Sequence, residues 1–248
     1  MKVDNKANVY FIETFGAFDG PGIRYILFLQ GCLMKCKFCH NRDSWDLSVN
    51  KEMTVEEVLN DYRKYKGFYK NGGITVSGGE PLIQIDFLID LFKACKQEGI
   101  HTCIDTSAGC YNHKMDDKIK TLMAYTDLVL LDIKHIDNEK HKDLTGMPNT
   151  HILEFAKLLN ELNVAVRTRH VLIPTINDGK EDLTNLRLFL DTLTNVEGID
   201  ILPYHTKGKM KWEKMGLVYP LDGIREANSD DVKKAELILK AGYKYKTT

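Results

Sequence analysis

Apolar runs alternate with helical patterns along almost the whole chain, and this alternation limits the possible folds more than any other feature. The runs are continuously apolar, which is typical of strands that are covered on both faces in a parallel sheet. Parallel strands need long crossover connections, and the amphipathic segments between the runs predict helices there. The predicted strands are residues 23–29, 73–76, 100–104, 128–131, 164–173 and 198–202.

The predicted helices carry start and stop signals. Thr54 and Glu57 have the spacing of a capping box, and Gly99 and Gly242 stand where left-handed caps are expected. The helical patterns cover residues 55–62, 86–98, 150–162, 182–193 and 229–241. Six strand–helix units predict an α/β fold, a partial (β/α)6 barrel of parallel strands, because eight units are needed for a closed barrel. No linker or low-complexity tract interrupts the pattern, so residues 1–248 are expected to form a single domain.

Composition argues against several classes of protein. Lys and Arg number 34 against 35 Asp and Glu, and this balance does not suit a protein held on nucleic acid or anionic lipid by bulk charge. No run approaches the roughly 18 apolar residues of a membrane span, and the first six residues lack the apolar core of a signal peptide. We expect a cytoplasmic protein with neither a nucleic-acid nor a membrane partner.

Polar side chains gather where the predicted strands end. In parallel sheets the chemistry collects at the carboxyl ends of the strands. Any one of these residues could be an ordinary surface residue, and Asp105 or Asp132 could cap a helix or form a salt bridge. Their presence at every strand predicts an active site at this edge. They are Cys32, Ser77 to Glu80, Asp105 and Thr106, Asp132 to Lys134, Arg169, and Pro203 to His205.

Three cysteines, Cys32, Cys36 and Cys39, are spaced C-x3-C-x2-C directly after the first strand. A structural zinc ion needs four ligands, and His40, adjacent to Cys39, is poorly placed to be the fourth. The segment 36–40 also fits the C-x-x-C-H pattern of haem attachment, which requires export and leaves Cys32 without a role. A cluster of four irons held by three thiolates leaves one iron open for a substrate or cofactor. The spacing favours this third interpretation.

The remaining cysteines are expected to play no part in metal binding. A cytosolic chain keeps its thiols reduced, so a disulfide framework is not expected. Cys95, Cys103 and Cys110 are interpreted as small buried hydrophobic residues.

The cysteine spacing, its place after the first strand and the strand–helix repeat resemble the radical S-adenosylmethionine superfamily. There, three cysteines bind a 4Fe–4S cluster whose open iron is chelated by the amino and carboxylate groups of S-adenosylmethionine. Reductive cleavage of that cofactor gives methionine and a 5′-deoxyadenosyl radical, which abstracts a hydrogen atom. The resemblance implies a 4Fe–4S cluster on Cys32, Cys36 and Cys39. Residues 78–80 resemble the Gly-Gly-Glu motif whose backbone meets the methionyl amino group.

The same resemblance implies further ligands. A monovalent cation, sodium or potassium, is expected beside the methionyl carboxylate, held by Asp105, Thr106, Asp132 and the carbonyl of Leu130. The family often has methionine where Leu130 stands, a harmless change if only the carbonyl contributes. The residues expected to contact S-adenosylmethionine are Phe38, Cys39, His40, Gly78, Gly79, Glu80, Asp105, Asp132, Ile133, Lys134 and His205.

A closer resemblance covers nearly the whole chain. The motifs at residues 19–24, 30–36, 39–43, 101–106, 131–134, 202–205, 208–209 and 211–212 resemble the activating enzymes of glycyl radical enzymes. Among these, they are most similar to the family that activates pyruvate formate-lyase (formate C-acetyltransferase). No cysteine lies between Cys39 and Cys95, so the ferredoxin-like insert of many related activases is absent. Two alternatives stay open: an activase of another glycyl radical enzyme, such as anaerobic ribonucleotide reductase, and a non-catalytic structural metal-binding module.

The resemblance also implies partners and a substrate. The protein substrate would be the glycyl radical loop of pyruvate formate-lyase, the electron donor flavodoxin or ferredoxin, and the activase itself a monomer. Since a glycine Cα–H is the reacting group, no catalytic acid or base is expected. Asp19 and Arg169 are expected to hold the backbone of the loop. If Arg169 instead forms an internal ion pair, Arg167 is the alternative candidate.

Overall fold

The computed structural model describes residues 5–243 of a chain that divides into two compact units. Unit 1 comprises Met1–Leu33 and Ser44–Leu130, and unit 2 comprises Met34–Asp43 and Leu131–Thr248. The chain therefore leaves unit 1 after Leu33, contributes a short segment to unit 2, and returns. Strand β6 (Leu128–Asp132) is the last strand of unit 1 and the first of unit 2.

The strands of unit 1 follow the order β3-β1-β2-β4-β5-β6. β2 (Arg24–Leu29), β4 (Gly73–Gly78) and β5 (His101–Thr106) pair in parallel, residue by residue from Arg24↔Gly73 onward. β1 (Lys6–Gly16) pairs antiparallel with β2 on one side and with β3 (Lys51–Thr54) on the other. Parallel pairing brings the carboxyl ends of β2, β4 and β5 to one edge.

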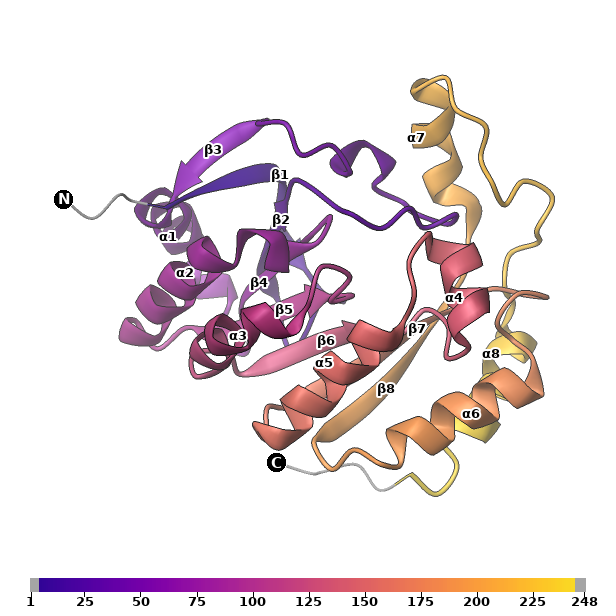
Figure 1. Ribbon diagram of the computed structural model, residues 1–248. Helices are drawn as coiled ribbons and strands as arrows, with labels where there is room; N and C mark the ends of the chain where they lie inside the picture. The colour runs from indigo at the N-terminus through magenta and orange to yellow at the C-terminus, as the bar shows by residue number, and fades with distance from the viewer. Residues whose placement is uncertain (1–4, 244–248) are drawn as a thin grey trace. The chain divides into compact units, whose positions relative to one another are not determined.

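Helices α1 (Val55–Lys64), α2 (Ile85–Gln97) and α3 (Asp116–Met123) lie side by side in unit 1 (Figure 1). The predicted capping box begins α1: Thr54 Oγ1 accepts from the Glu57 N–H, and Glu57 Oε2 accepts from the Thr54 N–H. Short 3-10 turns are η1 (Arg42–Ser44), η2 (Lys66–Phe68), η3 (Pro81–Gln84) and η4 (His113–Met115).

In unit 2 the strand order is β6-β7-β8, and β7 (Val166–Leu172) pairs in parallel with β8 (Val196–Pro203). α6 packs against α8, which covers β8 (Figure 1). The helices of the unit are α4 (Asn138–Thr145), α5 (Thr150–Glu161), α6 (Lys180–Leu190), α7 (Lys209–Lys214) and α8 (Ser229–Leu239), with a 3-10 turn, η5 (Thr206–Gly208), before α7.

The α/β class and the partial barrel are confirmed. The six predicted strands are β2 and β4 to β8, and the five predicted helices are α1, α2, α5, α6 and α8. The strand order has a free end at β3 in unit 1 and at β8 in unit 2. Five elements were not predicted: β1, β3, α3, α4 and α7. No helix of the described residues is long and apolar enough to cross a membrane.

Candidate functional site

The glycine turn after β4 fits closely against the end of β2, within unit 1. Gly78 has a φ of +132°, and a Cβ on it would lie 2.2 Å from the Leu29 nitrogen. A Cβ on Gly79 would lie 2.2 Å from the carbonyl oxygen of Gly31 and 3.1 Å from the Cβ of Cys32. The Glu80 N–H donates to the Gly31 carbonyl (2.8 Å). Only glycine permits this approach of backbone to Cys32.

The Glu80 side chain is 1% exposed and accepts a full set of hydrogen bonds within unit 1. Its Oε1 accepts from Thr106 Oγ1 (2.5 Å) and from the Leu82 N–H (3.1 Å). Its Oε2 accepts from Ser107 Oγ (2.8 Å), the Ser107 N–H (3.2 Å) and the Gly109 N–H (3.3 Å). The carboxylate thus ties the turn after β4 to the turn after β5 and orients Thr106. Its contact with S-adenosylmethionine stays a prediction.

Two predicted cation ligands lie at the end of β5. Thr106 is oriented by Glu80, as above, and Asp105 Oδ2 accepts from Ser77 Oγ (2.8 Å). Leu130 is 1% exposed, so its side chain belongs to the core and only its carbonyl is available as a ligand. In unit 2, Asp132 at the end of β6 forms an ion pair with Lys134 (3.0 Å). For Asp132, the salt bridge considered from sequence is present.

Lys134 also faces the ring that precedes the last cysteine. Its Nζ lies 5.4 Å from the centroid of the Phe38 ring, a cation–π arrangement, and its side chain is 12% exposed. Ile133 between Asp132 and Lys134 is buried, and its N–H donates to the carbonyl of Arg169 (3.0 Å). Within unit 2, two predicted cofactor residues, Lys134 after β6 and Phe38 before Cys39, therefore lie in contact.

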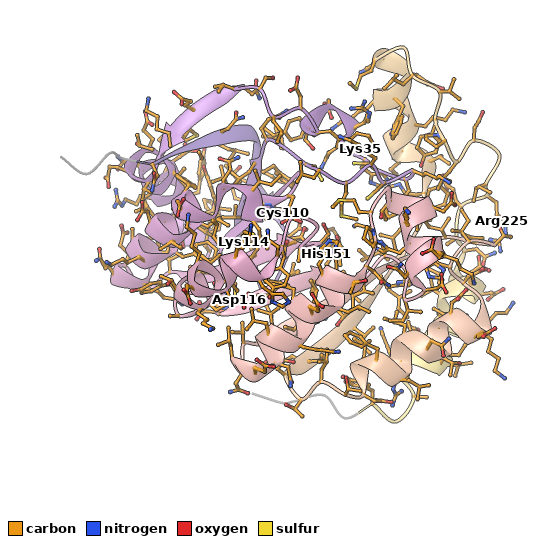
Figure 2. All side chains as sticks on the ribbon, viewed as in Figure 1. Lys35, Cys110, Lys114, Asp116, His151 and Arg225 are labelled. Atoms are coloured by element: carbon orange, nitrogen blue, oxygen red, sulfur yellow. The ribbon has the colours of Figure 1, made fainter. Side chains whose placement is uncertain are left out.

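The cysteine loop continues into unit 2, where the end of α4 braces it. The N–H of Lys35, labelled in Figure 2, donates to the Thr145 carbonyl (2.7 Å), and the Lys37 N–H donates to the Leu144 carbonyl (2.9 Å). Lys37 also forms an ion pair with Asp143 (2.7 Å). α4 was not predicted, and its role in holding the loop was missed because its sequence carries few apolar residues.

His40 and His205, both predicted to contact the cofactor, pack against each other in unit 2 with tilted rings. Their ring centroids lie 4.5 Å apart at an interplanar angle of 30°, and His40 Nε2 lies 3.3 Å from the His205 carbonyl oxygen. Burial, with the neighbouring His205 next in weight, lowers the pKa of His40. The His40 ring is therefore held by its contacts with His205.

The start of α7 contacts the residues after Cys39. Trp212 donates its indole N–H to the Cys39 carbonyl (2.9 Å), and Lys211 Nζ donates to Asn41 Oδ1 (3.0 Å). A Cβ on Gly208 would lie 2.6 Å from His40 Cδ2 and 3.2 Å from the Cys39 carbonyl oxygen. The motif at 208–212 was noticed in the sequence, but no role in the site was assigned to it.

The predicted substrate residues lie in separate units. In unit 1, the Asp19 carbonyl accepts from Thr75 Oγ1 (2.6 Å). In unit 2, Arg167 forms a bidentate ion pair with Asp200, at 2.5 and 3.1 Å. An internal ion pair is therefore made by Arg167, and the role of Arg169 in holding the loop stays a prediction.

The other three cysteines have the properties of structural thiols rather than of metal ligands. Cys95 and Cys103 are fully buried, and burial raises the pKa of Cys95 to about 12. Burial, followed by the charge of Glu80, raises the pKa of Cys110, which lies in the turn after β5 (Figure 2). A protonated thiol is a poor metal ligand. Cys95 and Cys103 therefore agree with the interpretation as small buried hydrophobic residues, whereas Cys110 is only partly buried.

The cysteine loop and the backbone around it suit an iron–sulfur cluster. Within residues 5–243, no three His, Cys, Asp or Glu side chains are gathered as a ready-made metal site. Cys32 and Cys36 are nevertheless buried and reduced, and the glycine cradle that Gly79 forms beside Cys32 is closed to any larger residue. Three thiols spaced C-x3-C-x2-C, with the Gly79 turn packed against Cys32, suit a cluster with one open iron.

Comparisons with known proteins agree on the family. Residues 26–187 match the model of the radical SAM superfamily. The pyruvate formate-lyase-activating enzyme of Staphylococcus epidermidis is 50% identical over 235 residues, which cover 93% of this chain and 94% of that protein. The corresponding enzyme of Staphylococcus aureus is 48% identical over the same shares.

Solved structures show the same fold. A domain of the pyruvate-formate lyase-activating enzyme from Bacteroides vulgatus covers 68% of this chain and 94% of that domain, with a TM-score of 0.56 and 29% identity. A radical SAM methyltransferase from Sphaerobacter thermophilus has a TM-score of 0.63 at 15% identity, covering 88% of this chain and 64% of that one. The chain therefore belongs to the radical SAM superfamily and, within it, to the family of the pyruvate formate-lyase-activating enzymes.

Proposed function

We propose that this enzyme activates pyruvate formate-lyase by placing a radical on one of its glycine residues. The observation that carries the proposal is 50% identity to a pyruvate formate-lyase-activating enzyme over 93% of the chain. The family model matches residues 26–187, a range that takes in strands of both units, and this supports treating residues 1–248 as one catalytic domain.

Cys32, Cys36 and Cys39 would hold a 4Fe–4S cluster, whose chemistry when bound is to supply the electron for reductive cleavage of S-adenosylmethionine. One electron and the cofactor give methionine and a 5′-deoxyadenosyl radical. Abstraction of a glycine Cα hydrogen then gives 5′-deoxyadenosine and the glycyl radical. The chain's own task in this reaction is positioning and exclusion of water, because no proton has to be moved by a side chain.

Each predicted ligand has a separate task in this proposal. The Gly78–Gly79 backbone would meet the methionyl amino group, and Lys134 the methionyl carboxylate or a ribose hydroxyl. The positive charge of Lys134, paired with Asp132, suits an anionic group there. His205, partly exposed beside His40, would donate to the ribose. The full set of proposed cofactor contacts is Phe38, Cys39, His40, Gly78, Gly79, Glu80, Asp105, Asp132, Ile133, Lys134 and His205.

A monovalent cation would be held by Asp105, Thr106, Asp132 and the Leu130 carbonyl. Asp19 and Arg169 would bind the backbone of the glycyl radical loop, since peptide carbonyls and N–H groups need both a donor and an acceptor. Flavodoxin or ferredoxin as electron donor, a monomeric state and a cytoplasmic location are further parts of the proposal that follow from the family resemblance.

The decisive experiment uses anaerobically reconstituted enzyme, purified lyase, a chemical reductant and S-adenosylmethionine. The expected result is a glycyl radical signal on the lyase by electron paramagnetic resonance, with 5′-deoxyadenosine formed in equal amount. Anaerobic ribonucleotide reductase offered in place of the lyase should acquire no radical. A radical on the reductase alone would identify a different partner, and a colourless protein that binds zinc would support the structural metal module.

A matched pair of cysteine variants tests the cluster ligands. Wild-type enzyme is expected to hold about four irons per chain, and Cys36→Ala should lose most of this iron and all cofactor cleavage. Cys95→Ala removes a thiol that is fully buried and protonated, so its iron content should match that of the wild type. Equal iron in both variants would contradict the assigned ligands.

A further inference from the structure

Trp212 of unit 2 is packed on several sides, and its indole N–H points at a main-chain carbonyl. Its side chain is buried, with 6% of the residue exposed. The Arg42 guanidinium lies 5.6 Å from the indole centroid, and the Tyr219 ring packs edge-on at 5.9 Å. Tyr204 Oη in turn donates to Tyr219 Oη (3.1 Å). With these neighbours in place, the indole ring has one orientation.

That orientation delivers the N–H to the last residue of the cysteine loop. Trp212 Nε1 donates to the Cys39 carbonyl oxygen at 2.9 Å, across 173 residues of sequence. Gly208 lies against the same carbonyl, which a Cβ would approach to 3.2 Å. Lys211 pairs with Asn41 (3.0 Å) and Asp43 (3.5 Å) just beyond. The segment 208–212 therefore holds residues 39–43 at several points.

We propose that Trp212 is a positioning residue that sets the orientation of the Cys39 peptide, and through it the Cys39 thiolate, for the iron–sulfur cluster. The inference rests on the proposed function, because it requires that Cys39 is a cluster ligand. The donor restrains the ψ torsion of Cys39, which sets the direction of the Cα–Cβ bond, and hence of the sulfur, relative to that carbonyl. The dipole of the same peptide also acts on the charge of the cluster, since hydrogen bonds and dipoles around ligands tune its potential.

The test compares Trp212→Phe with Tyr219→Phe. The first variant keeps an aromatic ring between Arg42 and Tyr219 but removes the N–H. The second removes a buried hydroxyl from the same cluster of rings and leaves the indole N–H in place. Both lose one buried hydrogen bond, and Trp212→Phe also loses part of a buried ring, so the free energy of unfolding of each metal-free variant is measured alongside.

The measurement is the rate at which reconstituted, cofactor-free enzyme loses iron to a chelator under anaerobic conditions, together with the reduction potential of the cluster. Trp212→Phe should lose iron about tenfold faster than the wild type, a change that corresponds to about 1.4 kcal/mol, and its potential should shift. Tyr219→Phe, which keeps the indole N–H on the Cys39 carbonyl, should keep the wild-type rate of iron loss. A Cβ on Gly208 would lie 2.6 Å from His40 Cδ2, 2.9 Å from His40 Cα and 3.2 Å from the Cys39 carbonyl oxygen. Gly208→Ala should therefore displace the same peptide and also lose iron faster than the wild type.

Either of two results would overturn the inference: a wild-type rate and potential in Trp212→Phe, or an equal effect in Tyr219→Phe. Neither readout uses the lyase or cleavage of S-adenosylmethionine. If the wild type holds its cluster but puts no radical on the lyase, the proposed activity fails while this inference is still decided by the variants. If the wild type binds no cluster, both are wrong.

Discussion

Gly79 illustrates how much a single residue can decide in this fold. Its missing side chain is what lets the turn after β4 lie against Gly31 and Cys32. The neighbouring Glu80 then holds that turn through five hydrogen bonds to its carboxylate, all within unit 1. The glycines were recognisable in the sequence as a close-approach motif, but the inward direction of the Glu80 carboxylate was not.

A Gly79→Ala substitution should therefore destabilise unit 1 and impair cluster loading. The new Cβ would meet a main-chain carbonyl at 2.2 Å, and a backbone atom cannot move away as a flexible side chain can. We expect a loss of about 2 kcal/mol in the free energy of unfolding, measured by urea denaturation of the metal-free protein, and less iron bound after reconstitution.

Gly67→Ala is the matched control for this substitution. No atom lies within 4 Å of the Cβ it would add, and its φ is not in the left-handed region. Stability and iron content should stay at wild-type values. If Gly79→Ala were as well tolerated as Gly67→Ala, the close packing of the turn against Cys32 would be refuted.

Among the elements, those with strong local signals were predicted and those held by distant contacts were not. α1 has a capping box, and α2 has an apolar face that ends before Gly99, whose φ is +67°. β1 was missed because its burial alternates, with Phe11 and Phe15 exposed at 55% and 48%. α7 is only six residues long, and the contact of Trp212 with Cys39 spans 173 positions. No local pattern reports such a contact.

The site likewise contains residues that were predicted from sequence and residues that were not. The three cysteines and the strand-end residues could be predicted because the cysteine motif and each of the strand-end residues directly follow a strand with a clear apolar pattern. The carbonyls of Leu144 and Thr145 that brace the loop could not be predicted, since main-chain acceptors leave no mark in a sequence. The ion pair between Arg167 and Asp200 was not readable either, because it joins two strands across 33 positions of sequence.

At the scale of an element, the capping box of α1 should be measurable on its own. Thr54→Ala removes the oxygen that accepts from the Glu57 N–H, leaving that donor without its capping acceptor. We expect a loss of about 1 kcal/mol in the free energy of unfolding, read from urea denaturation. Thr184→Ala in α6 removes a hydroxyl that bonds the Lys180 carbonyl within the helix, where alanine has the higher helix propensity. If Thr184→Ala were as destabilising as Thr54→Ala, the cap would not be the cause of the loss.

The stability of the whole molecule should fall in mild acid because unit 2 buries several histidines. Burial lowers the pKa of His135, His141 and His170, and the pKa of His141 falls to about 4. Lys134, His135 and His151 add to the effect on His141, whereas its hydrogen bond to the Met147 carbonyl opposes it. Between pH 6.5 and pH 4, His141 is therefore protonated in the unfolded chain and neutral in the folded chain.

The stabilisation from His141 is thus complete above pH 6.5 and is lost as the pH falls toward 4. Its share of the loss between pH 7.5 and pH 5 should be about 2 kcal/mol, measured by urea denaturation of the metal-free protein across that range. His141→Gln should flatten the dependence. His113→Gln, at a side chain that is 71% exposed, should leave it unchanged, and a flat profile in the wild type would contradict the prediction.

The bond between Trp212 and Cys39 has a consequence for how the protein is made. Ribosomes add about 5 to 20 residues per second, so the 173 positions between the two residues take roughly 9 to 35 s to synthesise. For most of that interval Cys36 and Cys39 lie outside the ribosome without the tryptophan that later holds their loop. Iron bound by nascent chains isolated in mid-synthesis should therefore be lost to a chelator faster than iron bound by finished chains.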